Sequence, residues 1–172
     1  MAGTNIPSTP FDGNMAVWIV PAIADPSAPT AAEITAGKDV SCYLTPDGYA
    51  PTIDQATITD DRLCSTETYG QPGRKTRGLV LTGIDNTNST YEEEFNELVE
   101  ALVEGTDMFV VRRRGIPYET AIAATTQKVS VLPIKPGVKQ DVAPEANSVI
   151  RSTWTCFITG QGYDDVPVAA GA

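Results

Sequence analysis

The sequence predicts a mainly β fold, namely a β-sandwich or barrel of about seven strands flanked by one α-helix at about residues 89–104. Three observations support this. Several short segments are rich in β-branched and aromatic residues, polar stretches with glycine and proline separate them, and one stretch alone has the apolar spacing of a long helix. With 172 residues, 41% hydrophobic and 20% charged, the chain suits one folded domain with a hydrophobic core.

The N-terminal part of the chain combines an arm, a strand and a short helix. Residues 1–16 contain two prolines and two glycines with little periodicity, so we expect an extended N-terminal arm. A first strand is expected over residues 17–23, with Pro21 placing it at an edge or a bulge. A short helix should follow, because Thr30 is a suitable N-cap and Glu33 completes a capping box.

The remaining strands are expected where β-branched residues cluster between turns. The alternation is clearest over residues 150–160, where Ser152, Trp154 and Cys156 share a face that should point to the core. Five other strands are expected at residues 39–44, 52–59, 77–84, 108–113 and 128–140. The tail over residues 161–172 is expected to be loose or to form a second arm.

A long charged connection is expected between two of these strands, over residues 60–78. Structureless loops of this length in compact domains are usually functional or mobile. The segment surrounds a Gly-Gln-Pro-Gly turn, which is no phosphate loop because no Gly-Lys-Ser/Thr follows. Its charged residues are candidates for contacts between subunits: Asp60, Asp61, Arg62, Glu67, Arg74, Lys75 and Arg77.

The predicted helix at residues 89–104 has both an N-terminal signal and an apolar stripe. Ser89 is a good N-cap and Glu92 stands where a capping box needs it. The outward face is acidic, which fits a solvated surface better than a catalytic or metal-binding one, because nothing indicates a pocket. We therefore expect this helix to cover a sheet through its apolar face, formed by Tyr91, Phe95, Leu98, Val99 and Leu102.

Composition excludes several functional classes. The chain has no histidine, so neither a Ser-His-Asp system nor the commonest zinc sites can be built. Cys42, Cys64 and Cys156 lie far apart, which disfavours a disulfide framework; we expect Cys42 and Cys156 to be buried and Cys64 to be exposed. We predict no catalytic residue, no cofactor and no metal. A formal net charge of −10 disfavours tight nucleic-acid binding.

The densest basic patch is Arg112, Arg113 and Arg114, in which the first and third share one face of a strand. Since the chain as a whole is acidic, salt bridges to acidic neighbours are favoured over nucleic-acid binding, either within the chain or between subunits. An acidic subunit with one arginine cluster suits head-to-tail assembly, because complementary charges orient association. The N-terminus shows no secretory signal and no apolar run long enough to cross a membrane.

The order of segments resembles the major tail protein, or tail tube protein, of long-tailed, non-contractile phages that infect actinobacteria. The likeness runs from VWIVPAIADPSAPTAAEITAGKDVSCYLTPDGYAP through DDRLCSTETYGQPGR to RRRGIPYETAIAATTQKVSVLPIKPGVKQDVAPEANSVIRSTWTCFITG. It covers residues 17–160, which we expect to form the tail-tube domain between the arm and the tail. The first sixteen residues are longer than this family leads us to expect.

The resemblance implies a structural virion protein rather than an enzyme. Six subunits would form a ring, rings would stack into a hollow tube, and double-stranded DNA would pass through the lumen without specific binding. It further implies tape-measure, tail-terminator and distal-tail or baseplate partners, with the protein in the host cytoplasm before assembly and in the phage tail afterwards. The alternatives are a tail-tip, decoration or adhesion module with the same fold, and a carboxylate-based hydrolase.

Overall fold

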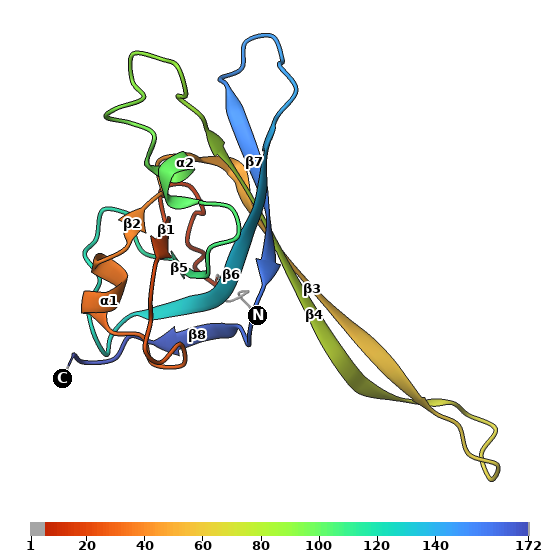
Figure 1. The fold of residues 1–172 in the computed structure, drawn as a ribbon. Helices are drawn as coiled ribbons and strands as arrows, with labels where there is room; N and C mark the ends of the chain where they lie inside the picture. The colour runs from red at the N-terminus through yellow and green to blue at the C-terminus, as the bar shows by residue number, and fades with distance from the viewer. Residues whose placement is uncertain (1–5, 172) are drawn as a thin grey trace.

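The computed structural model describes residues 6–171 and confirms the mainly β fold (Figure 1). Antiparallel strands form a single sheet that curls into a half-barrel, in the order β2-β1-β5-β6-β7-β4-β3, and β8 pairs with β6. The strands are β1 (Met15–Val20), β2 (Lys38–Asp39), β3 (Leu44–Asp60), β4 (Tyr69–Ile84), β5 (Met108–Arg114), β6 (Lys128–Asp141), β7 (Arg151–Ile158) and β8 (Tyr163–Pro167). The helices are α1 (Ala31–Thr35) and α2 (Glu97–Ala101).

The sheet is covered on both faces around β1, β5 and β6. On one face Val17, Ile19 and Val110 pack with Trp154 and Leu98, the buried residue of α2. On the other face the alternate side chains of the same strands pack with Ile34 of α1 and with Val168, which follows β8: Ala16, Trp18, Val20, Val111, Val129 and Val131. Burial on both faces explains why the first strand reads as a continuous apolar run.

The capping box predicted for the first helix is confirmed. The Thr30 hydroxyl accepts a bond from the Glu33 backbone N–H at 3.2 Å, and the Glu33 carboxylate accepts one from the Thr30 backbone N–H at 2.8 Å. These bonds satisfy N–H groups that the first turn leaves without an intrahelical partner.

The prediction of one long helix over residues 89–104 is wrong. The structure has a series of turns over residues 89–94, and α2 spans the five residues Glu97–Ala101. Leu98 and Leu102 are buried as expected and Val99 packs against the core, but Tyr91 is 61% exposed and Phe95 is 50% exposed. The cause is a network of side-chain bonds to the backbone, described below, which offers the chain an alternative to helical hydrogen bonds.

The long loop predicted over residues 60–78 is also wrong. Most of it belongs to a hairpin in which β3 and β4 pair continuously from Tyr49–Leu81 to Asp60–Tyr69, apart from one bulge between Gln55 and Thr57. The turn itself spans residues 61–68.

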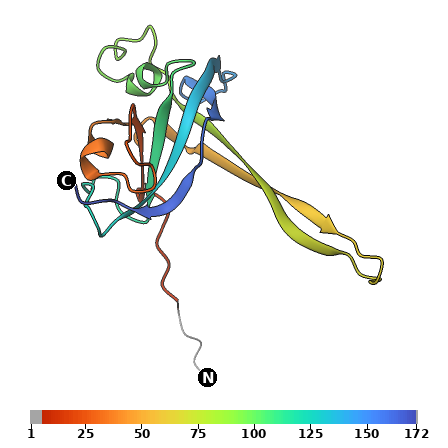
Figure 2. The same cartoon turned by 60° about the horizontal axis from the view of Figure 1, so that its bottom comes forward.

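The two ends of the chain differ from each other. Residues 6–10 are extended and exposed and lead away from the body (Figure 2), whereas residues 15 and 16 already belong to β1; the first five residues of the predicted arm lie outside the described part. The prediction of a loose C-terminal tail is wrong, because β8 pairs with β6 and Val168 is 1% exposed.

Cys156 is buried as predicted and Cys64 is exposed as predicted, but Cys42 is exposed rather than buried.

A buried carboxylate joins the segment after β4 to the sheet. Asp85 is 5% exposed and accepts bonds from Lys139 Nζ at 2.8 Å and from Ser152 Oγ at 2.6 Å. Burial by itself raises the pKa of Asp85, but the bonds from Lys139, Ser152 and Thr87 outweigh it and hold the pKa well below the usual carboxyl range.

We expect the free energy of unfolding to fall on acidification because of this group. A carboxyl whose pKa is lowered in the folded state stabilises the fold above its unfolded pKa of about 3.9, and that stabilisation is lost as the pH falls further. Asp85→Asn should lower the free energy of unfolding at pH 7 by on the order of 2–3 kcal/mol and reduce the loss between about pH 4 and pH 2. Urea unfolding at several pH values measures both effects. An unaltered pH profile in the variant would contradict the assignment.

Candidate assembly surface

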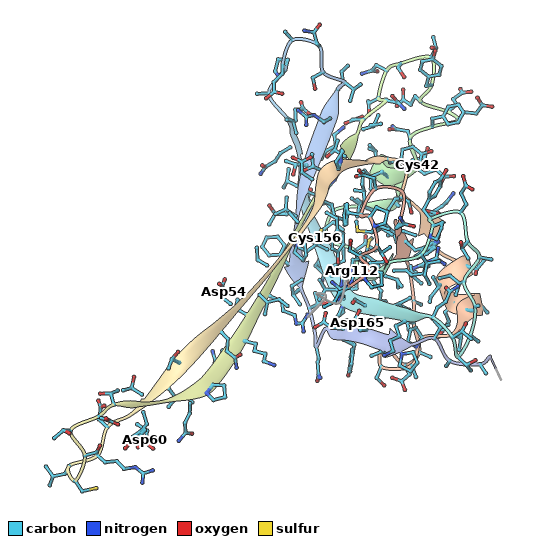
Figure 3. The ribbon with its side chains drawn as sticks, turned by 180° about the vertical axis from the view of Figure 1, so that it is seen from behind. Cys42, Asp54, Asp60, Arg112, Cys156 and Asp165 are labelled. Atoms are coloured by element: carbon cyan, nitrogen blue, oxygen red, sulfur yellow. The ribbon has the colours of Figure 1, made fainter. Side chains whose placement is uncertain are left out.

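The most prominent surface feature is the outer part of the β3–β4 hairpin, residues 54–76, which projects from the body (Figures 1 and 2). None of these residues is buried, and both faces of the two-stranded ribbon lie in solvent. Apolar side chains are exposed on and beside it: Ile58 at 55%, Tyr69 at 49% and, at its base, Ile53 at 54%. Figure 3 shows Asp54 and Asp60 on this ribbon, far from Cys156 in the body.

An isolated two-stranded ribbon is only marginally stable in water. In this fold β3 is also the end strand of the sheet, so its outer edge carries unpaired backbone N–H and C=O groups. An exposed ribbon with apolar side chains and an open edge is typical of a surface that another chain covers. The hairpin is therefore a candidate assembly surface.

The structure places six of the seven charged residues predicted for the long loop on the hairpin strands or their turn, with Arg77 at the base. Arg62 and Asp60 form an ion pair at 2.9 Å, so they satisfy each other. Register places Lys75 opposite Gln55 and Arg77 opposite Ile53, which puts these four side chains on one face of the ribbon. Arg74 lies at the bulge. Neither Arg74 nor Lys75 makes an ion pair with any described residue.

A groove at the base of the hairpin collects three arginines from two strands, Arg77 from β4 and Arg112 and Arg114 from β5. Arg77 bonds Asp164, with Nη1 to Oδ1 at 3.2 Å, and Arg114 bonds Asp165 at 3.0 Å. Arg112 lies 5.6 Å over the ring of Tyr49 and donates to Ser130 Oγ at 3.0 Å. These side chains line a hollow of about 280 Å³, and Figure 3 shows Arg112 beside Asp165.

Asp164 and Asp165 were not predicted as site residues, because they lie in the tail that we expected to be loose. The bond from Arg77 holds the pKa of Asp164 below its usual range. The run over residues 163–168, which ends in Val-Pro-Val, carries a weak strand signal that could have indicated their position.

Arg113 is different from its two neighbours, because its side chain is fully buried. Nη1 donates to the Thr120 carbonyl at 2.7 Å and to Gln127 Oε1 at 3.0 Å, and Nη2 donates to the Pro117 carbonyl at 2.9 Å. The guanidinium stacks 5.3 Å from the centroid of the Trp18 ring. Arg113 therefore holds the segment after β5 inside its own chain and is not available to a neighbouring subunit, which removes it from the predicted inter-subunit salt bridges. Arg112 and Arg114 stay candidates.

A second projecting feature is the acidic loop, residues 86–96, which runs from the end of β4 to α2. Its exposed Tyr91 and Phe95 rings lie edge to face with centroids 6.5 Å apart. Asn96, 5% exposed, accepts a bond from the Asn86 backbone N–H through Oδ1 at 3.1 Å, and Asn86 Nδ2 donates to the Phe95 carbonyl. The loop therefore presents two aromatic rings from a fixed conformation.

A metal site of clustered ligands and a membrane-spanning helix are both absent from the described residues 6–171. No group of three or more Cys, Asp or Glu side chains in this range is placed to hold a metal ion. None of the helices in this range is both long enough and apolar enough to cross a membrane. The exposed hairpin and acidic loop are the candidate contacts with other protein chains.

The fold is a mainly β half-barrel with a projecting hairpin that exposes apolar side chains. A model of the phage tail tube protein family matches residues 3–171, so the chain belongs to the phage tail tube protein family. This is a family of structural proteins of the phage tail, and membership implies a place in a multi-subunit tail with other phage proteins. A search of curated proteins gave no match.

One solved structure with the same fold is the anti-feeding prophage (AFP) baseplate, determined by cryo-electron microscopy with 6-fold symmetry. A chain of that baseplate matches with a TM-score of 0.51 at 12% sequence identity. The match covers 92% of this chain and 98% of the other. At this identity the likeness concerns the fold.

Proposed function

We propose that this chain is the repeating subunit of a hollow tail tube, in which hexameric rings stack head to tail and genomic DNA passes through the lumen. The single observation that supports this most strongly is the projecting hairpin, residues 54–76, exposed on both faces although it carries apolar side chains and an open strand edge. Contact with neighbouring subunits would bury this surface. Family membership supports the same proposal.

The acidity of the chain suits such a duct. Each phosphate neutralised by a lysine or arginine adds affinity for DNA, so a basic lumen would slow transit. With a net charge of −10, carboxylates lining the lumen would repel the duplex and keep it off the wall. The proposed role is passive and includes no chemical turnover. The tape-measure, tail-terminator and distal-tail or baseplate proteins of the same phage are the proposed partners.

Negative-stain electron microscopy of the concentrated protein, without other phage proteins, tests this proposal. We expect hollow tubes of uniform width or rings with six-fold symmetry. A parallel sample incubated with a tail-tip complex tests for tube growth that needs an initiator. Monomers in both samples would contradict the proposal.

A baseplate or tail-tip subunit is the second candidate, because the similar solved structure comes from a baseplate. Such a subunit would form a single ring or a small oligomer and would not stack. Rings that never extend into tubes, even with an initiator present, would favour it over the tube.

A further inference from the structure

We propose that the acidic loop of one subunit, residues 86–96, docks on the hairpin of the next subunit at Arg74 and Lys75. This inference rests on the proposed function, because it names the surface that the projecting hairpin meets in a stack. It concerns two features of this chain, each of which lacks a partner within the described residues.

A census of the basic residues points to the hairpin. All twelve lysines and arginines lie within residues 6–171, and seven of them make ion pairs inside the chain. Arg112 and Arg113 bond other groups of the chain. The three that remain are Arg74, Lys75 and Lys128, of which the first two are adjacent and exposed on the hairpin. Arg74 and Lys75 are thus an adjacent pair of cations with no ion pair inside the described residues; Asp54, Asp61 and Glu67 on the same hairpin also make none.

The acidic loop carries the complementary charge. Glu93 and Glu94 are exposed and make no ion pair with any described residue. Glu92 is half-buried and accepts the Asn88 backbone N–H at 2.8 Å, so it helps to hold the loop. The exposed rings of Tyr91 and Phe95 flank these glutamates. Exposed aromatic residues on a rigid backbone are characteristic of residues that contribute most to protein–protein binding, because little conformational entropy is lost when they are covered.

The positions of the two features suit a stack. In both Figure 1 and Figure 2 the acidic loop and the tip of the hairpin lie on opposite sides of the body. A contact between two different surfaces on opposite sides of one subunit is heterologous, so it can repeat from subunit to subunit without closing. Arg74 can also stack on an aromatic ring of the loop, and the exposed Ile58 and Tyr69 supply apolar contact area.

Charge reversal and rescue test this inference. One variant reverses the loop (Glu93→Lys with Glu94→Lys), a second reverses the hairpin (Arg74→Glu with Lys75→Glu), and a third carries all four changes. Glu92 is left intact because it supports the loop. A control with Asp47→Lys and Glu119→Lys changes the formal charge by the same amount as the loop variant, at exposed residues without an ion pair. Circular dichroism confirms that each variant is folded.

We expect each double variant to raise the protein concentration needed for tube growth at least about tenfold, because like charges then face each other. The variant with all four changes should return to within about threefold of the wild-type value, as coupled pairs do in a double-mutant cycle. Loop-reversed protein that assembles like the wild type would overturn the inference, and so would failure of the four-change variant to recover. The control should assemble like the wild type.

A second measurement keeps the inference separate from the proposed function. If wild-type protein stays monomeric both alone and with a tail-tip complex, the proposed function fails, but the contact can still be measured by sedimentation at low ionic strength. Loop-reversed and hairpin-reversed proteins should each remain monomeric alone and should associate when mixed, since the positive loop of one meets the negative hairpin of the other. No association in the mixture would overturn the inference, whatever the outcome for tubes.

Discussion

Replacing residues 54–76 by an Asn-Gly turn between Ile53 and Arg77 is expected to give a folded monomer that forms no tubes. Ile53 and Arg77 face each other in register, so a two-residue turn can join them. The removed residues include none that is buried, and the core of the body is untouched. The free energy of unfolding should therefore change by less than about 1 kcal/mol. No core contact is lost, and a shorter connection between the two strands costs less entropy to close.

Electron microscopy measures whether the shortened protein forms tubes, and urea unfolding measures its free energy of unfolding. The shortened protein retains the acidic loop, so it should also act as a chain stopper. Adding it to wild-type protein should shorten the tubes in proportion to its fraction. Tubes of ordinary length from the shortened protein alone would show that the hairpin is not an assembly surface.

Arg113→Met is expected to lower the free energy of unfolding by about 3–5 kcal/mol, the largest effect of any single substitution that we predict. The guanidinium is fully buried and donates to backbone carbonyls over Pro117–Ala121 and to Gln127. Removing it leaves the buried Gln127 Oε1 and several part-buried carbonyls without this donor, and an unpaired buried polar group costs more than its bond contributes. Arg113→Lys should be intermediate, because an ammonium cannot reproduce the planar set of donors.

Arg112 provides the matched control on the adjacent position. It is half-buried, stacks on Tyr49 and donates to Ser130, so Arg112→Met should cost only about 1 kcal/mol. Urea unfolding of the two variants under identical conditions makes the comparison. Equal losses for the two would contradict the distinction between a buried anchor and a partly exposed arginine.

The acidic loop shows why an apolar pattern can mislead. Tyr91, Phe95, Leu98 and Leu102 follow helical spacing, yet the first two are exposed and the last two are buried. The capping residues Ser89 and Glu92 are used, but they bond backbone N–H groups of Tyr91 and Asn88 within a turn instead of starting a helix. Periodicity cannot distinguish apolar side chains that face the core from apolar side chains that are exposed, because both follow the same spacing.

The basic triplet shows a different limit. Alternation correctly placed Arg112 and Arg114 on one face of a strand and Arg113 on the other. Arg113 lies inside the domain because the segment after β5 folds over its side chain and Trp18 of β1 stacks against it. Three identical residues in a row carry no signal of this kind, so sequence reasoning treated all three alike, as candidates for salt bridges within the chain or between subunits.

The sequence by itself determined the β class, most strands of the body, the capping box of the first helix and the family. These follow from local propensity, alternation and segment order, which act over a few residues. Only the tertiary structure decided that residues 54–76 project as a ribbon, that Arg113 lies inside and that the tail adds β8 to the sheet. The physical reason is that strand pairing and burial depend on residues far apart in the chain: Asp164 meets Arg77, and Val168 joins a core built around Trp18.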